Sequence, residues 1–157
     1  MSAVHVETIA YSSAAEVLAL VRDFKFCTLP RDEWTHRAHL TVALWHELRY
    51  PWPEAVRLMR EGILRYNAAH GIRQTRESGY HETLTLFWLR MVREYLTELA
   101  PGGKRELASL ANGLAERYPK ELPLRYYSRE RLMSWEARAA WVWPDLLPLK
   151  TLAGDED

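Results

Sequence analysis

Apolar side chains recur along most of the chain at intervals of three and four residues, the spacing that places them on one face of an α-helix. No stretch alternates apolar and polar residues between turn signals in the manner of a half-buried strand. The sequence therefore predicts an all-α fold: a single-domain helical bundle of about six helices with an extended C-terminal tail. We expect the domain to include residues 1–157, with its core within about 13–149. The helices are expected at residues 14–26, from between 30 and 36 to 50, and at 53–70, 78–100, 104–117 and 128–141.

Capping residues mark several of the predicted helix ends. Ser13 is followed three residues later by Glu16, the arrangement of a capping box, and Ser78 is expected to cap the fourth helix. Because that helix has a wide apolar face, we predict that it is the central one. After residue 141 proline is frequent, so an extended tail is expected, held to the bundle by Trp143, Leu146 and Leu147. The predicted core includes Leu40, Leu44, Leu84, Trp88 and Leu132.

Composition and charge narrow the classes of partner. The 21 basic and 21 acidic side chains balance, so no overall field favours nucleic acid or an anionic membrane, and we expect neither as a partner. Seventeen of the basic residues are arginines, which suit an acidic small-molecule ligand, although solvated arginines on helix faces explain the same bias. A homo-oligomer is compatible with this composition.

Cysteine usage and the lack of long apolar runs bear on the compartment. Cys27 is the only cysteine, which excludes an intramolecular disulfide and a cysteine-rich zinc site. No uninterrupted apolar run approaches the ~20 residues of a membrane span, and the N-terminal stretch lacks the pattern of a secretion signal. A cytoplasmic location is therefore expected.

Candidate chemistry is concentrated in three histidines. His36 and His39 lie three residues apart at the start of the second predicted helix, so both imidazoles can reach one face of it. His81 lies near the start of the fourth. If successive helices pack antiparallel, alternate helices start at the same end of the bundle, so these two starts meet there. Three neutral imidazoles with an open coordination position are typical of a catalytic metal site, so we predict that His36, His39 and His81 bind one divalent ion, with zinc, iron and nickel as candidates.

The same histidines also have structural interpretations, which remain open. His36 could donate to a loop carbonyl, and His39 could be a core histidine whose hydrogen bonds are satisfied. Two acids are candidates for proton transfer: Glu33, three residues before His36, and Glu82, beside His81. Glu33 could reach the face of His36 or orient its ring, whereas Glu82 could instead favour the helix dipole as a first-turn acid.

Four sequence motifs carry a resemblance to a known group. These are Thr35-His36-Arg37-Ala38-His39-Leu40, Tyr80-His81-Glu82-Thr83, Tyr127-Ser128 with Arg131-Leu132, and Pro144-Asp145-Leu146-Leu147. Across about residues 33–149 the chain resembles an uncharacterised bacterial all-helical protein family, which implies a single helical domain but no substrate. It is more loosely similar to DinB-like bundles, which hold one metal ion with three histidines, although the spacing here differs.

Two classes of function remain open from the sequence. The first is a small metal-dependent or His/Glu acid-base enzyme that acts on a small polar molecule, for which an acidic one is an option. The second is a non-catalytic helical module that binds a ligand or a protein. Histidines gathered in a pocket would favour the first class, whereas histidines dispersed over the surface would favour the second.

Overall fold

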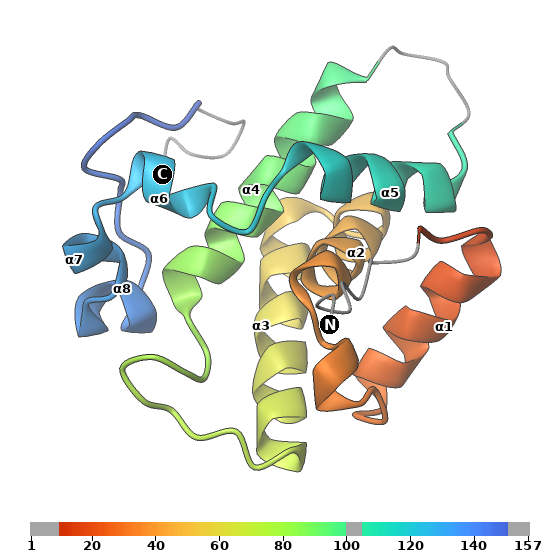
Figure 1. Ribbon diagram of the computed structural model, residues 1–157, viewed down its shortest axis with the longest axis horizontal. Helices are drawn as coiled ribbons and strands as arrows, with labels where there is room; N and C mark the ends of the chain where they lie inside the picture. The colour runs from red at the N-terminus through yellow and green to blue at the C-terminus, as the bar shows by residue number, and fades with distance from the viewer. Residues whose placement is uncertain (1–9, 100–104, 151–157) are drawn as a thin grey trace, which may run out of the picture.

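All regular secondary structure in the described part of the chain is helical. A computed structural model describes residues 10–99 and 105–150, and no strand occurs within them, which confirms the all-α prediction (Figure 1). None of the helices in these ranges has the length and apolar character that crossing a membrane requires. The elements are α1 (Ala14–Lys25), the 3-10 helix η1 (Arg31–Glu33), α2 (His36–Arg49), α3 (Trp52–Ala69), α4 (Glu82–Glu98), α5 (Leu107–Arg117), α6 (Pro123–Tyr126), α7 (Arg129–Leu132) and α8 (Trp135–Ala139).

Side-chain caps explain where the first helices begin. The Ser13 hydroxyl accepts the backbone N–H of Glu16, as the capping motif predicts, and the Thr35 hydroxyl accepts that of Ala38 at the start of α2. The expected cap at Ser78 is wrong. His81 occupies the N-cap of α4 instead, because its ring nitrogen accepts the backbone N–H of Leu84. The predicted end of this helix at residues 100–103 lies outside the described residues.

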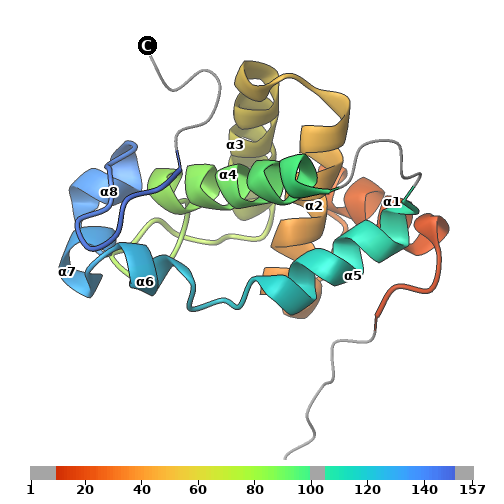
Figure 2. The same ribbon diagram turned by 90° about the horizontal axis from the view of Figure 1, so that it is seen from above.

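The central helix is α2, which corrects the expectation that the fourth helix is central. It contacts α1, α3, α4 and α5, and Figures 1 and 2 show it in the middle of these four. Its residues from Leu40 to Leu44 are all buried, and because five consecutive helical residues cover every direction around the axis, α2 is enclosed on all sides. The amphipathic pattern of α4 instead marks a helix with one face on the core.

The predicted core is confirmed only in part. Leu40, Leu44 and Leu132 are buried. Leu84 and Trp88 are only partly buried and pack at the edge of the core, where both line a pocket. Their apolar character therefore reflects two surfaces at once, a core contact and a pocket wall, which periodicity alone does not separate.

The C-terminal third departs furthest from the prediction. The single helix expected over residues 128–141 is two short helices, α7 and α8, because the Ser134 hydroxyl caps a new helix start at the N–H of Ala137. The extended tail is present, but the three residues expected to hold it, Trp143, Leu146 and Leu147, are each about half exposed. Leu149 packs against the core instead, and Ser128 donates from its N–H and its hydroxyl to the Asp145 carboxylate.

Candidate functional site

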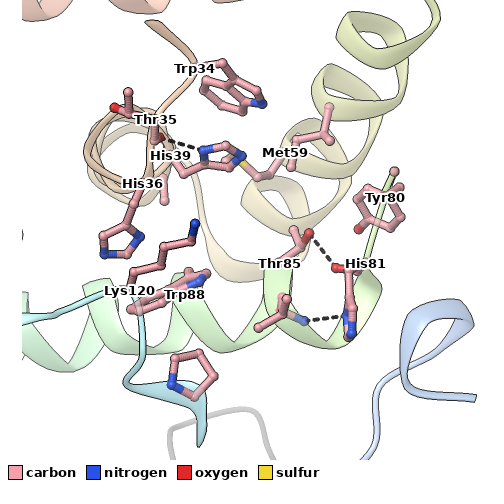
Figure 3. Close-up of a pocket in the computed structure, with 15 residues that line it drawn as sticks. Trp34, Thr35, His36, His39, Met59, Tyr80, His81, Thr85, Trp88 and Lys120 are labelled. Carbon is pink, nitrogen blue, oxygen red and sulfur yellow. Dashed lines mark hydrogen bonds between the residues drawn. The ribbon is translucent and has the colours of Figure 1, made fainter. Parts of the chain in front are cut away.

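A pocket opens between the N-terminal ends of α2 and α4, as the sequence predicted for these two helix starts (Figure 3). Its volume is about 380 Å³, within the usual range of small-molecule sites. Helix α3 forms one wall, and the connection after α5 forms another. The lining residues are Trp34, Thr35, His36, His39, Ala43, Met59, Ile63, Gly79, Tyr80, His81, Leu84, Thr85, Trp88, Lys120 and Pro123.

His39 presents one free ring nitrogen to this pocket. Its Nδ1 lies 2.7 Å from the Thr35 carbonyl, which can only accept a hydrogen bond, so Nδ1 carries the proton and Nε2 keeps its lone pair. The ring also stacks on Trp34, with centroids 3.7 Å apart. Burial lowers the pKa of His39 to about 4. The hydrogen bond to Thr35 raises this pKa, and the charges of His36 and Lys120 lower it further. His39 is therefore a neutral imidazole at pH 7, held in one tautomer.

His36 is anchored at the pocket edge by a distant part of the chain. Its Nε2 donates to the Tyr118 carbonyl at 2.8 Å, and its ring lies against Trp88 with centroids 4.7 Å apart. Burial lowers the pKa of His36, while the bond to Tyr118 opposes that shift and the charge of Lys120 adds to it. The bond at Nε2 leaves Nδ1 as the acceptor nitrogen.

His81 has a structural role at both ring nitrogens. Nε2 donates to the Leu132 carbonyl at 2.7 Å, and Nδ1 accepts the Leu84 N–H at 3.1 Å as the cap of α4. The residue is 6% exposed, and burial lowers its pKa, although the Leu132 bond acts in the opposite direction. In Figure 3, His81 lies across the pocket from His36, with Thr85 and Trp88 between them. No lone pair of His81 is therefore available to a ligand.

The described residues do not supply the expected three-histidine metal centre. Within residues 10–99 and 105–150, no group of three or more histidine, cysteine, aspartate or glutamate side chains is placed to hold a metal ion. His36, His39 and His81 line one pocket, but both nitrogens of His81 are already bound to protein groups. Metal binding by this triad stays a prediction, and it would require His81 to release the cap of α4 or the Leu132 carbonyl.

Glu82 is held in an ion pair beside the pocket. Its two carboxylate oxygens accept from Arg60 at 2.9 and 2.5 Å, and one also accepts from the Tyr80 hydroxyl at 2.5 Å. Burial alone would raise the pKa of Glu82, but the bonds from Arg60 and Tyr80 and the Arg60 charge outweigh it and lower the pKa. Glu82 is therefore ionised at neutral pH, and its lone pairs are already committed.

Glu33 does not have the geometry expected of a proton-transfer partner. It lies in η1, and α2 begins only at His36, so one continuous helix does not carry the two side chains. Its side chain is exposed, and it is not among the pocket residues. The expected reach from Glu33 to the face of His36 therefore lacks the helical spacing on which it was based.

Lys120 and Tyr80 are polar pocket residues that were not candidate site residues from the sequence. Lys120 follows α5 and extends into the pocket toward His39, as Figure 3 shows. Tyr80 precedes α4 and links the pocket wall to Glu82. A lone lysine between two prolines carries no recognisable signal, because only the packing of the α5–α6 connection against α2 brings it to the histidines.

A buried arginine fixes the loop that carries Tyr80. The guanidinium of Arg138, on α8, donates to the carbonyls of Arg76, Ser78 and Tyr80 at 2.7, 3.2 and 3.4 Å. Gly79 has a φ of 93° within this loop, a conformation that L side chains rarely adopt. The loop wall of the pocket is thus built from backbone groups tied to the C-terminal helices.

Chemically, the site combines one cation with neutral acceptors in an aromatic and aliphatic cavity. The Lys120 ammonium donates, and the free nitrogens of His39 and His36 accept. Comparisons of the chain with protein-family models, with curated proteins and with solved structures found no match.

Proposed function

We propose that this protein binds a small polar organic molecule in the pocket between α2 and α4, with His39 as its principal hydrogen-bond acceptor. The observation that carries the proposal is the free Nε2 of His39, which faces a cavity of about 380 Å³ while Nδ1 is bound to the Thr35 carbonyl. A partly buried imidazole with a fixed tautomer and one nitrogen open to a cavity is prepared to accept a hydrogen bond from a ligand.

The surroundings of His39 support binding because they hold the ring in place before a ligand arrives. Trp34 covers one face of the imidazole and is itself stacked on Phe24, with centroids 4.5 Å apart. The Thr35 carbonyl fixes the rotation of the ring. A ligand therefore pays little entropy to order its partner, which is the usual source of affinity in a preformed site.

A pair of matched substitutions on one helix tests the proposal. Thr85→Trp places an indole in the pocket, whereas Thr97→Trp places the same indole on an exposed position of α4. Each threonine hydroxyl bonds a carbonyl within one turn of its own residue, so the two changes lose similar contacts. In a ligand-observed NMR screen of small polar fragments, we expect binders that are lost with Thr85→Trp and kept with Thr97→Trp. The proposal is refuted if no fragment behaves in this way.

Catalysis in the same pocket is the second candidate, favoured by the fixed His39 tautomer, since an unprotonated Nε2 can also take a proton from a bound molecule. The pKa of about 4 makes His39 a weak base, so this reaction would need a ligand whose proton is already acidic. Once a ligand is known, a His39→Gln variant that retains affinity within a few-fold and loses turnover would establish the enzymatic role. A metal-dependent form of that role would in addition show one ion per chain by elemental analysis of untagged protein.

A further inference from the structure

The side chains that line the pocket carry a net positive charge. Lys120 is among the lining residues, and no aspartate or glutamate is. The nearest acid along α4, Glu82, is neutralised by two bonds from Arg60. Within the described ranges no carboxylate lies within ion-pair distance of Lys120, whereas Lys150 contacts both Glu94 and Glu98. Among the described residues the pocket lining therefore holds one cation and no carboxylate, and the nearest acid along the chain from Lys120, Glu121, acts on the pocket residue His36.

Two imidazole nitrogens of the pocket residues can accept a hydrogen bond. His39 and His36 each present an acceptor nitrogen, because the other nitrogen of each ring donates to a backbone carbonyl. The hydroxyls of Thr85 and Tyr80 already donate to the His81 carbonyl and to the Glu82 carboxylate. A ligand N–H or O–H can meet these acceptors, while Lys120, the Thr35 hydroxyl and the indole N–H groups of Trp34 and Trp88 can donate to an anionic group.

The remaining walls are apolar. Met59 and Ile63 from α3 and Leu84 and Trp88 from α4 surround the polar groups. In Figure 3, Lys120 and His39 lie close together on one side of the cavity, while Tyr80 lies on the other. The pocket is thus polar near Lys120 and hydrophobic elsewhere, as is usual for a small-molecule site.

From these three observations we infer that the ligand is a small organic acid that places its anionic group at Lys120 and donates an N–H or O–H to His39. This inference rests on the proposed binding function and specifies its ligand class. A carboxylate and a phosphate monoester share the required anion, so both sources are compared in the experiment. Lys120 is exposed and solvated, so a neutral ligand would gain no ion pair from it, and a cationic one would be repelled by it.

Four probes separate the contributions of charge and donor. Indole-3-acetate has the acid, the N–H and a flat apolar body. Its methyl ester lacks the charge, 1-naphthaleneacetate lacks the N–H, and phenyl phosphate replaces the carboxylate. Dissociation constants are measured by isothermal titration calorimetry on the full chain. We expect indole-3-acetate to bind about tenfold more tightly than either analogue, since each lacks one charged or buried hydrogen bond.

Variants then assign each contribution to a residue. Lys120→Met is expected to weaken indole-3-acetate about tenfold and to leave the ester unchanged. Lys25→Met is the matched control, because Lys25 lies on α1 over the Trp45 ring and outside the pocket, so it should change neither. His39→Phe keeps an aromatic ring against Trp34 but removes the acceptor, so it should weaken indole-3-acetate and leave 1-naphthaleneacetate unchanged.

The acid class of the ligand and ligand binding in the pocket can fail separately. If the ester binds as tightly as the acid, or if Lys120→Met and Lys25→Met act alike, the acid class is wrong while binding in the pocket stands. If no probe binds although fragments sensitive to Thr85→Trp exist, the inference also fails. If no such fragments exist, the proposed function itself fails. Phenyl phosphate binding more tightly than both carboxylates would assign the anion as a phosphate ester.

Discussion

His81 offers the sharpest test of the site, because its structural role and its predicted role as a metal ligand lead to opposite results. In the structure one imidazole joins two distant elements: Nδ1 caps α4 at Leu84, and Nε2 reaches the Leu132 carbonyl at the end of α7. The perturbation is the pair His81→Ala and His81→Asn. Asparagine is a good N-cap residue but is too short to replace the bond made by Nε2.

The magnitudes follow from the two bonds. Loss of an N-cap costs about 1 kcal/mol of stability, and leaving the Leu132 carbonyl without its partner in a buried position costs about 1–3 kcal/mol. We therefore expect His81→Ala to lower the free energy of unfolding by about 2–4 kcal/mol. His81→Asn should recover about 1 kcal/mol of that loss through its cap.

Urea unfolding monitored by tryptophan fluorescence measures both values, with and without EDTA. If His81 acts only on the fold, EDTA leaves the wild-type midpoint unchanged, and zinc does not rescue either variant. The pKa of His81 is lowered from 6.5 by burial, so the unfolded state binds the proton more readily. The wild type should therefore lose stability as the pH falls below about 6.5, and the variants should lose less.

A His81→Ala protein within about 0.5 kcal/mol of wild type would refute the structural role, because neither bond could then be important. A wild-type midpoint that falls on addition of EDTA would instead restore the metal prediction, since it would show an ion that stabilises the folded chain.

Two further predictions concern groups outside the pocket. Burial raises the pKa of Glu47 from 4.5 to about 7 despite the charge of Arg93, so the folded state binds the proton more tightly than the unfolded state. The free energy of unfolding should therefore fall by about 1–2 kcal/mol, after allowing for solvent screening, as the pH rises from 4.5 to above 7. Glu47→Gln should abolish this pH dependence in urea titrations. Arg138→Met removes the donors to three carbonyls of the Tyr80 loop and should speed amide hydrogen exchange there by at least tenfold, whereas equal exchange in both proteins would show that the arginine does not hold the loop.

The sequence predicted the helices correctly where neighbouring residues alone determine where a helix begins. Ser13 caps α1 as expected, and the apolar periodicity located the five helices from α1 to α5. It was insufficient where two local signals compete. Ser78 is an ordinary cap residue, yet three backbone carbonyls of its loop are bound by Arg138, and the helix begins only after His81. The Ser78 hydroxyl donates to the Arg73 carbonyl instead of capping α4, and its own carbonyl accepts from Arg138, 60 positions away along the chain.

For the site, the sequence predicted which histidines share a pocket but not which of their nitrogens are free. His36 and His81 are bound by carbonyls 82 and 51 residues away, at Tyr118 and Leu132, and no spacing rule anticipates such partners. His39 differs, because its partner is the Thr35 carbonyl four residues earlier, one turn back in the same helix.

That difference has a consequence for chemistry at this site. A histidine whose ring bonds a carbonyl of its own helix needs no distant partner to fix its tautomer. A histidine bonded across the fold has a fixed tautomer only where a distant carbonyl reaches its ring. Of the three histidines, His39 alone combines a locally fixed tautomer with a lone pair that faces the cavity. Residues 34–39 supply the Thr35 carbonyl, the His39 ring and the stacking residue Trp34 within six consecutive positions, so one helix start builds this acceptor of the pocket.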